Sequence, residues 1–202
     1  MTLNIKDKPK DGFERVVYAE EDKFNFYSVI AIHNTKRGPA LGGCRYFNYQ
    51  DFNKQEEDVL KLAEAMTYKN SLAELPFGGG KATIHSKINK KDAYSLFGEV
   101  LNKLNGTYIT AGDMGTVDED LRGFREYSDH VCNPIGSDSG LGTALGVYYS
   151  MLGCVEFKFG QDSLVNKNIF IKGYGKTGSR IASLCKKDGA NIEISDLEHK
   201  KD

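Results

Sequence analysis

The sequence lacks an excess of charge of either sign and any long apolar run. Its 202 residues carry 27 lysines and arginines against 28 aspartates and glutamates, a balance that gives no electrostatic reason to expect binding to nucleic acid or to an anionic membrane. No stretch approaches the roughly 20 apolar residues of a membrane-spanning helix, and the first ten residues, MTLNIKDKPK, lack the apolar core of a signal peptide. We therefore expect a cytoplasmic protein that contacts neither nucleic acid nor membrane.

Clustered cysteines are also missing. Cys44, Cys132, Cys154 and Cys185 lie far apart, without the paired spacing or the neighbouring histidines of a zinc site. We expect four reduced, buried thiols and no metal site. With 40% apolar residues, the chain is otherwise typical of a globular protein with a substantial core.

Glycine, in contrast, is abundant, and three glycines stand together in the segment 75–85, LPFGGGKATIH. Gly78, Gly79 and Gly80 predict a bend without side chains, which another group can approach closely. Lys81 follows at the start of a β-branched run, where a strand can hold its side chain in one place. The segment is not a phosphate-binding P-loop, because Leu75 and Ala82 stand where that motif requires Gly and Ser or Thr. A solvated lysine after an ordinary turn is the alternative.

A predicted hairpin and a second glycine-rich segment come earlier in the chain. β-Branched and aromatic residues at 16–18 and 24–32 flank the charged turn 20–23, which predicts two paired strands. The segment 37–43 then ends in Gly42 and Gly43. We expect a bend there, either one whose main-chain N–H groups bind an anion or a plain turn between strands.

Lys69 lies on a predicted amphipathic helix. Asn53 and Glu56 form a capping-box pattern at its start, and the apolar positions that follow have helical spacing: Val59, Leu62, Ala63, Met66 and Ala73. Lys69 falls on the same stripe, so we expect its ammonium to point toward the buried side, where a bound carboxylate would balance its charge. The alternative is a side chain that extends past the stripe into water.

An acidic residue follows the next predicted strand. Apolar spacing predicts a helix over 90–105 and a strand over 108–111. Asp113 comes directly after that strand, at the carboxyl end where α/β folds place functional groups, although an ordinary turn aspartate fits the pattern too. Thr116 and Glu119 then predict the cap of a further helix.

A strand–helix–strand unit closes the chain. Helical spacing predicts a connecting helix through 145–160, with Thr143 as its expected cap. The segment 168–196 then has a strand, a GxGxxG turn, a helix and a second strand, and the turn consists of Gly173, Tyr174, Gly175, Lys176, Thr177 and Gly178. In this context the glycines let a pyrophosphate reach the helix N-terminus, while Asp196 after the second strand accepts hydrogen bonds from ribose hydroxyls and favours NAD over NADP. A glycine-rich turn in an unrelated α/β domain is the alternative.

Four motifs, in this order and ahead of the GxGxxG turn, resemble those of the Glu/Leu/Phe/Val dehydrogenase superfamily, most closely its leucine dehydrogenases. They are GPALGG at 38–43, MTYKN at 66–70, GGGK at 78–81 and AGDMG at 111–115. The resemblance covers the chain from about Val16 onward. It implies a homo-oligomeric enzyme that uses NAD for the reversible oxidative deamination of an L-amino acid to a 2-oxo acid and ammonia.

The resemblance also implies roles for individual residues. Lys69, with the backbone at Gly42 and Gly43, would hold the substrate carboxylate. Lys81 would activate water and polarise the carbonyl, and Asp113 would pass protons to and from the amino nitrogen. These roles agree with general chemistry, because a hydride leaves the α-carbon readily only when the amine is neutral.

One sequence position carries information on which substrate side chain is bound. Relatives that act on glutamate have a lysine where Leu41 stands, so Leu41, with Met66 nearby, implies a pocket for an apolar side chain. Leucine, valine, isoleucine and phenylalanine all stay possible substrates. Thr143 resembles a further substrate-side residue of the family.

We therefore predict an α/β fold in which an N-terminal substrate domain with a mixed sheet and flanking helices precedes the first βαβ unit of an incomplete Rossmann domain. Residues 1–142 would form the substrate-binding, catalytic and dimerisation domain, and residues 143–202 the connecting helix and the start of the NAD-binding domain. Two other hypotheses stay open: a truncated, catalytically silent substrate-binding or assembly domain of this family, and a different NAD-linked oxidoreductase on a similar scaffold.

Overall fold

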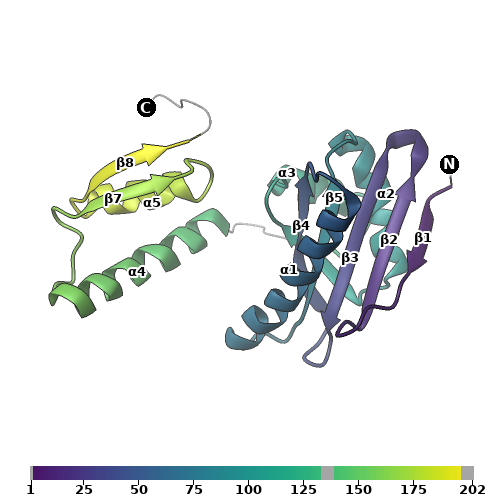
Figure 1. Ribbon diagram of the computed structural model, residues 1–202, viewed down its shortest axis with the longest axis horizontal. Coiled ribbons are helices and arrows are strands. Elements are labelled where there is room, and N and C mark those ends of the chain that lie inside the picture. The colour runs from purple at the N-terminus through teal and green to yellow at the C-terminus, as the bar shows by residue number, and fades with distance from the viewer. Residues whose placement is uncertain (1, 133–138, 197–202) are drawn as a thin grey trace. The chain divides into compact units, whose positions relative to one another are not determined.

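The computed structural model describes residues 2–132 and 139–196 (Figure 1). The chain forms two compact units, Met1–Asn133 and Pro134–Asp202, which we call unit 1 and unit 2. The expected domain boundary after residue 142 falls inside helix α4 (Ser139–Phe159). The functions assigned to the two expected domains stay predictions.

Unit 1 is built on a six-stranded mixed sheet. Its strands are β1 (Asn4–Asp7), β2 (Arg15–Glu21), β3 (Phe26–Asn34), β4 (Ala40–Phe47), β5 (Gly78–His85) and β6 (Tyr108–Gly112), in the spatial order β1-β2-β3-β5-β4-β6. The pairs β1–β2, β2–β3 and β3–β5 are antiparallel, whereas β4 is parallel to both β5 and β6. The predicted hairpin is confirmed as β2 and β3, and the predicted mixed α/β fold class is confirmed as well.

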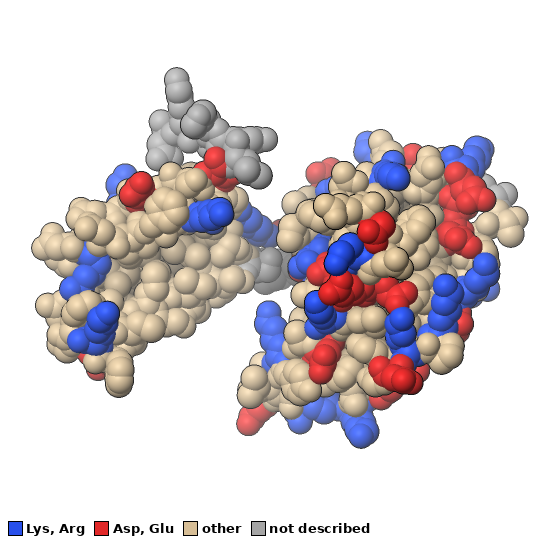
Figure 2. Space-filling view, viewed as in Figure 1, with Lys and Arg blue, Asp and Glu red and all other residues tan. Residues whose placement is uncertain are grey.

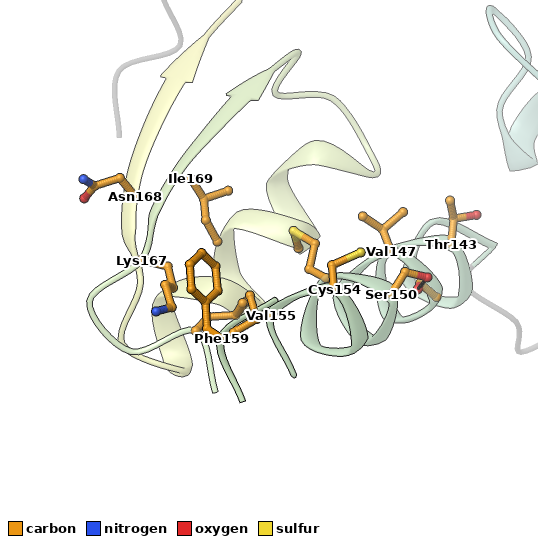
Figure 3. A pocket seen from close by; sticks show the side chains of 12 residues that line it. Thr143, Val147, Ser150, Cys154, Val155, Phe159, Lys167, Asn168 and Ile169 are labelled. Atoms are coloured by element: carbon orange, nitrogen blue, oxygen red, sulfur yellow. Dashed lines mark hydrogen bonds between the residues drawn. The ribbon is translucent and has the colours of Figure 1, made fainter. Parts of the chain in front are cut away.

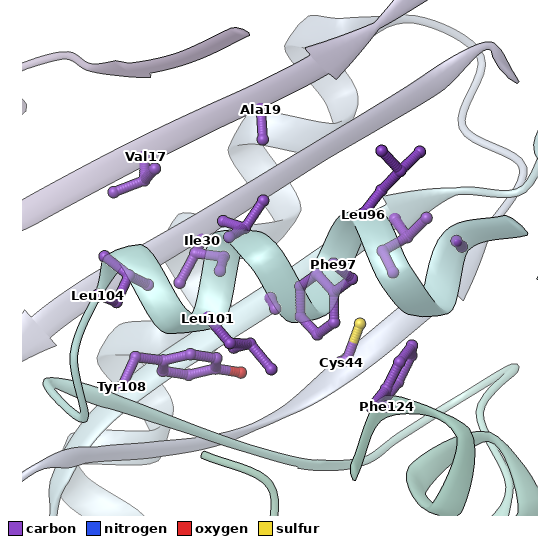
Figure 4. Packing of buried hydrophobic residues seen from close by; sticks show 14 of the residues in the cluster. Val17, Ala19, Ile30, Cys44, Leu96, Phe97, Leu101, Leu104, Tyr108 and Phe124 are labelled. Carbon is purple, nitrogen blue, oxygen red and sulfur yellow. The ribbon is translucent and has the colours of Figure 1, made fainter. Parts of the chain in front are cut away.

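Helices cover both faces of this sheet (Figure 1). Helix α1 (Phe52–Leu72) packs on one face through Val59 and Ala63, against apolar residues of β2 and β3. Helices α2 (Lys90–Lys103) and α3 (Asp118–Arg125) contribute to the larger apolar core on the other face. Figure 4 shows Leu96, Phe97, Leu101 and Leu104 of α2 packed among strand residues and Phe124 of α3. Burial of these side chains is the main stabilising contribution in unit 1.

The glycine-rich segments lie in strands, so the predicted bends at 37–43 and 78–80 are wrong for Gly42, Gly43 and the three consecutive glycines. The physical reason is close packing. A Cβ at Gly79 would overlap the main chain of Thr67 in α1, and a Cβ at Gly42 would overlap the carbonyl of Gly80. Glycine here permits close approach of neighbouring backbones within extended structure.

Helix starts differ from the sequence-based expectations. Asp51, not Asn53, caps α1 by accepting a 2.8 Å hydrogen bond from the Lys54 N–H. Val117, not Thr116, is the N-cap of α3, and Thr143 lies within α4 and is not its cap. The Thr116 hydroxyl instead donates to the Cys44 carbonyl at 2.7 Å. This hydrogen bond tethers the loop after β6 to β4. A Ser, Thr, Asp or Asn near a helix start thus indicated each helix but not its first residue.

Unit 2 contains the predicted βαβ unit. The parallel strands β7 (Asn168–Lys172) and β8 (Asn191–Ser195) flank α5 (Gly178–Lys187), and residues of α4 pack against a small core at Leu164, Cys185 and Ala190. Large apolar side chains also face solvent here, including Phe157 at 95% exposure and Phe170 at 60%. Accordingly, Figure 2 shows a face of unit 2 with few charges, while Lys or Arg and Asp or Glu are interspersed over the visible face of unit 1.

The four cysteines are free, but only Cys44 and Cys185 are buried, so the expectation of burial is wrong for Cys132 and Cys154. Across residues 2–132 and 139–196 no helix is long and apolar enough to cross a membrane. The same residues hold no group of three or more His, Cys, Asp or Glu side chains able to bind a metal ion.

The close approach of α1 to β5 gives a stability prediction. Gly79→Ala places a methyl group against the Thr67 main chain, and we expect the free energy of unfolding to fall by about 1–3 kcal/mol, the usual cost of overpacking. Gly112→Ala is the matched control, because its Cβ would lie 3.6 Å from Leu121, an ordinary contact. Urea denaturation measures both variants, and an equal effect of the two substitutions would contradict this packing explanation.

Candidate functional site

A buried ion pair joins two of the predicted catalytic residues. Lys81 extends from β5 on the face that α1 covers, its side chain is only 5% exposed, and its Nζ lies 2.9 Å from Oδ1 of Asp113. Asp113 directly follows β6, and β4 separates β5 from β6 in the sheet. The parallel register of these three strands therefore brings the two side chains together, although they stand 32 positions apart in the sequence.

Arg45 holds the other oxygen of the same carboxylate. Its Nε donates to Oδ2 of Asp113 at 2.8 Å, and its Nη1 donates to both carboxylate oxygens of Asp58 in α1, at 2.8 and 3.1 Å. The Tyr49 hydroxyl donates to Asp58 at 2.7 Å. Charges of alternating sign thus run through Asp58, Arg45, Asp113 and Lys81, with the neutral Tyr49 hydroxyl at one end. We call this row of five side chains the charge network. Charge-assisted hydrogen bonds of this kind fix side-chain positions.

The charge network shifts the pKa of Asp113 and of Arg45. Burial alone would raise the pKa of Asp113, but the neighbouring Lys81 and Arg45 outweigh it, and the pKa is lowered. Burial acts to lower the pKa of Arg45, yet Asp113 and Asp58 raise it overall. Asp113 is therefore a carboxylate at neutral pH, with a side chain that is 22% exposed and open to a ligand.

Neither Arg45, Asp58 nor Tyr49 was expected from the sequence. One signal was present: Arg45 stands two residues after Gly43, so on a strand the two share a face. Gly43 itself leaves room for the acid, because a Cβ there would lie 2.8 Å from the Asp113 Cβ. The glycine and the arginine of β4 together let Asp113 sit close above the sheet.

Lys69 is not buried. It is exposed on α1, so the expectation that its ammonium faces the interior is wrong. The buried line of the helix runs instead through Gln55, Val59, Ala63 and Asn70. Lys69 is rotated away from that line. Its exposure agrees with the alternative expectation, a side chain that extends into water.

Asn70, next to Lys69, fastens the end of α1 to two strands. Its Nδ2 donates to the Gly78 carbonyl at 2.6 Å and to the Leu41 carbonyl at 3.3 Å. Leu41 and Met66 are both half-buried, so each keeps part of its apolar surface accessible. The roles of Leu41, Gly42, Gly43, Met66 and Lys69 toward a substrate stay predictions.

The GxGxxG loop of unit 2 joins β7 to the N-terminus of α5. Gly173 has φ +99°, which favours glycine, and a Cβ at Gly178 would overlap the Gly173 carbonyl. A Cβ at Gly175 would meet nothing within 4 Å, so one side of the loop stays open. The Asp196 carboxylate, directly after β8, accepts a hydrogen bond from the Tyr174 N–H. These features fit the compact turn that a dinucleotide pyrophosphate requires.

Thr143 lies on α4 and lines a groove of about 690 Å³ within unit 2. Figure 3 shows Thr143, Val147, Ser150 and Cys154 along the helix and Ile169 from β7. The groove is mainly apolar. The substrate role expected for Thr143 stays a prediction.

The charge network predicts a pH dependence of stability. Because the folded-state pKa of Asp113 is lowered, its contribution is present above the unfolded-state pKa of about 3.9 and is lost as the pH falls through the lower folded value. We expect Asp113→Asn to lower the free energy of unfolding by about 1–3 kcal/mol at neutral pH, and by less below about pH 4. Urea denaturation at several pH values measures this, with the exposed Asp129→Asn as control. A difference between wild type and Asp113→Asn that is independent of pH would contradict it.

Comparisons with known proteins agree with this architecture. The family model described as "Glu/Leu/Phe/Val dehydrogenase, dimerisation domain" matches residues 14–129. Phenylalanine dehydrogenase of Thermoactinomyces intermedius is 38% identical over 195 residues, which cover 93% of this chain and 53% of that protein. Leucine dehydrogenase of Bacillus subtilis (strain 168) is 37% identical over 201 residues, covering 96% and 55%.

Solved structures share this fold. L-tryptophan dehydrogenase from Nostoc punctiforme is 28% identical with a TM-score of 0.66, over 93% of this chain and 54% of that one. Glutamate dehydrogenase from Peptoniphilus asaccharolyticus has a TM-score of 0.65 over 99% and 54% of the two chains at 19% identity, which shows a shared fold. This chain spans about half the length of the curated relatives named above. Because the family match covers more than half of its residues, this chain belongs to the Glu/Leu/Phe/Val dehydrogenase family.

Proposed function

We propose that this chain serves the NAD-dependent oxidative deamination of an apolar L-amino acid to the 2-oxo acid and ammonia. The observation that carries the proposal is the buried Lys81–Asp113 ion pair, with 2.9 Å between Nζ and Oδ1. Its relatives support the reaction class, since they include phenylalanine and leucine dehydrogenases. In this proposal residues 1–142 bind the substrate and dimerise, and residues 143–202 connect to and begin a Rossmann domain.

The chemistry divides between a base and an acid. An amino-acid ammonium must lose a proton before a hydride can leave its α-carbon, and the Asp113 carboxylate accepts that proton. NAD, when bound, supplies the acceptor for the hydride. Lys81 first gives its ammonium proton to solvent, and water then attacks the α-carbon of the iminium ion while Lys81 takes a proton from that water. Asp113 returns its proton to the amino nitrogen, so ammonia leaves as the hydroxyl proton passes to solvent and the carbonyl forms. Lys81 also polarises the carbonyl oxygen of the 2-oxo acid in the reverse direction.

Arg45 and Asp58 act through Asp113. They fix its carboxylate from the side opposite Lys81, so Oδ1 is directed to the lysine and to the bound amine. A group prepositioned in this way needs little reorganisation during the reaction. We therefore assign Arg45 as a positioning residue.

The substrate is held by its carboxylate and by its side chain. Lys69, exposed at the end of α1, supplies the cation for the carboxylate. The backbone at Gly42 and Gly43 and the Thr143 side chain are the further groups proposed to bind the substrate. Leu41 and Met66, both partly accessible, supply an apolar wall. Burying a leucine-sized side chain stabilises by about 1.5–3 kcal/mol, which favours apolar substrates without selecting one of them.

The GxGxxG loop is the proposed place for the cofactor. Gly173, Gly175 and Gly178, with Tyr174, Lys176 and Thr177, would hold the pyrophosphate at the N-terminus of α5. Asp196 would accept hydrogen bonds from the ribose and repel a 2′-phosphate, which favours NAD over NADP. We also propose that the chain forms a homo-oligomer, since the matching family model is described as a dimerisation domain. Its proposed location is the cytoplasm.

One observation favours a second function. The described part of unit 2 has a two-stranded parallel sheet with Phe157 and Phe170 exposed, and a sheet of this size cannot bury both faces. A catalytically silent substrate-binding or assembly domain is therefore the alternative.

A turnover assay separates these functions. We expect the purified chain to form NADH from NAD with L-leucine or L-phenylalanine, and Lys81→Ala and Asp113→Asn to lower the rate by about 100-fold or more, because each removes a proton-transfer group. Absorbance of NADH measures the rate. If wild type and Lys81→Ala are equally inactive while L-leucine still binds in a calorimetric titration, the silent domain is the correct assignment. Absence of both turnover and binding would exclude both functions.

Side-chain preference gives a further prediction. Leu41→Lys places a cation on the proposed apolar wall, so we expect kcat/KM for L-leucine to fall about tenfold or more and that for L-glutamate to rise. Phe157→Lys, at an exposed position of unit 2, adds the same charge elsewhere and is the control. Initial rates with both amino acids measure the effect, and an unchanged leucine-to-glutamate ratio in Leu41→Lys would remove Leu41 from the substrate pocket.

A further inference from the structure

A second hollow lies in unit 1, at the far end of β5 from the glycine run. It has a volume of about 380 Å³ and is formed where the turn between β2 and β3, the start of α1 and the end of β5 meet. Its walls include Glu20 and Glu21 from the end of β2, Asp22 from the turn, Tyr27 and Phe52, and His85. The proposed function uses none of these residues.

This hollow is separate from the charge network. His85 lies four residues after Lys81 on β5, which corresponds to about 13 Å along a strand. Between them, Thr83 is buried and its hydroxyl accepts a hydrogen bond from Gln55 at 3.1 Å. A ligand in the hollow would therefore not contact the Lys81–Asp113 pair directly.

His85 is a buried polar group without a protein partner. It is only 4% exposed, its Nδ1 is inaccessible and unpaired, and no residue of the described chain forms a hydrogen bond with either ring nitrogen. Burial lowers the pKa of His85, and the nearby ammonium of Lys87 lowers it further, so the ring is neutral at pH 7. A neutral imidazole offers one N–H donor and one acceptor nitrogen. Buried polar groups are normally satisfied. Because Nδ1 is inaccessible, a ligand in the hollow can meet the ring only at Nε2, which is not among the inaccessible unpaired atoms.

The charge on the walls is mainly negative. Asp22 is exposed, and its carboxylate has no side-chain partner among the described residues. Glu20 is held by Asn4 at 2.7 Å and by Lys6 at 3.4 Å, and Glu21 accepts from the Phe24 N–H at 2.9 Å. Lys87 is the one cation among the lining residues. Three carboxylates line the hollow against the ammonium of Lys87, and Lys6 offsets the charge of Glu20. The remaining net charge is negative, which favours a cationic ligand.

Two aromatic rings form an apolar wall beside these carboxylates. The ring centroids of Tyr27 and Phe52 are 4.2 Å apart, and the Phe52 ring lies 6.4 Å from that of His85. Aromatic faces next to carboxylates attract an alkylammonium ion and cover its apolar body. The lining does not converge as a metal site would, because the described residues hold no group of three or more His, Cys, Asp or Glu side chains able to bind a metal ion.

We propose that this hollow binds a small organic ammonium ion, with the ammonium beside Asp22 and Glu20, the apolar body against Tyr27 and Phe52, and Nε2 of His85 as an additional partner. The proposal does not depend on the dehydrogenase function, because it uses different residues. Both the carboxylate of Asp22 and Nε2 of His85 gain a partner in the complex.

Titration with phenethylamine, which is protonated at pH 7, tests the site on the ¹⁵N-labelled chain. We expect saturable NMR shifts at the amides of Asp22 and Tyr27 and at the ring of His85. 2-Phenylethanol and phenylacetate, of similar size but neutral and anionic, should bind about tenfold more weakly or not at all, because neither can pair with the carboxylates. Equal binding of the alcohol, an absence of saturable shifts, or shifts confined to the surroundings of Lys81 and Asp113 would overturn the proposal.

Matched variants locate the interaction. Asp22→Asn removes one charge from an exposed turn without loss of a protein contact, and we expect amine affinity to fall about tenfold. Glu99→Gln removes a charge from an exposed position of α2 outside the hollow and should leave the affinity unchanged. His85→Leu should also weaken binding, and Asp22→Asn keeps the test decisive if that variant does not fold. Unchanged affinity in Asp22→Asn would refute the site.

Discussion

The pairing of Lys81 with Asp113 is the interaction on which the structure of the site depends. A lysine side chain with 5% exposure would lose its hydration at a large cost without an opposite charge at hydrogen-bond distance. Asp113 meets that requirement and is itself held by Arg45, which Asp58 holds in turn. Strands β4 and β5, the loop after β6 and helix α1 each contribute one of these charges. The sheet and its covering helix are thereby joined through Arg45 and Asp58, the groups that hold the proposed proton-transfer residue Asp113 in place.

The sequence patterns predicted the elements of the fold better than their detailed geometry. Alternation and helical spacing indicated the β2–β3 hairpin, the helix that follows residue 89 and the βαβ unit of unit 2, because those elements bury apolar side chains in a regular pattern. Glycine runs were misinterpreted as bends. Gly42 and Gly79 lie inside strands, where contact with neighbouring backbones removes the space for a Cβ. Such contacts join segments distant in sequence, so local patterns cannot show them.

The candidate site was predicted in part for the same reason. Lys81 and Asp113 could be named from motifs, and their contact follows from the order of the parallel strands. Arg45 and Asp58 could not be named, since their roles arise only when β4 and α1 meet Asp113. Lys69 shows the opposite error, because helical spacing alone does not fix which side of α1 faces the sheet. The buried line contains Gln55 and Asn70, two polar residues that a hydrophobic stripe would not include.

Asn70 has a mechanical consequence. Its single amide group links the last turn of α1 to the carbonyls of Gly78 and Leu41, so those three segments must shift together or break both links. The neighbouring lysine at position 69 therefore projects from a stiff base, although its own side chain is free in solvent. Only the side chain of that lysine, and not the helix that carries it, would lose conformational freedom on meeting an anion.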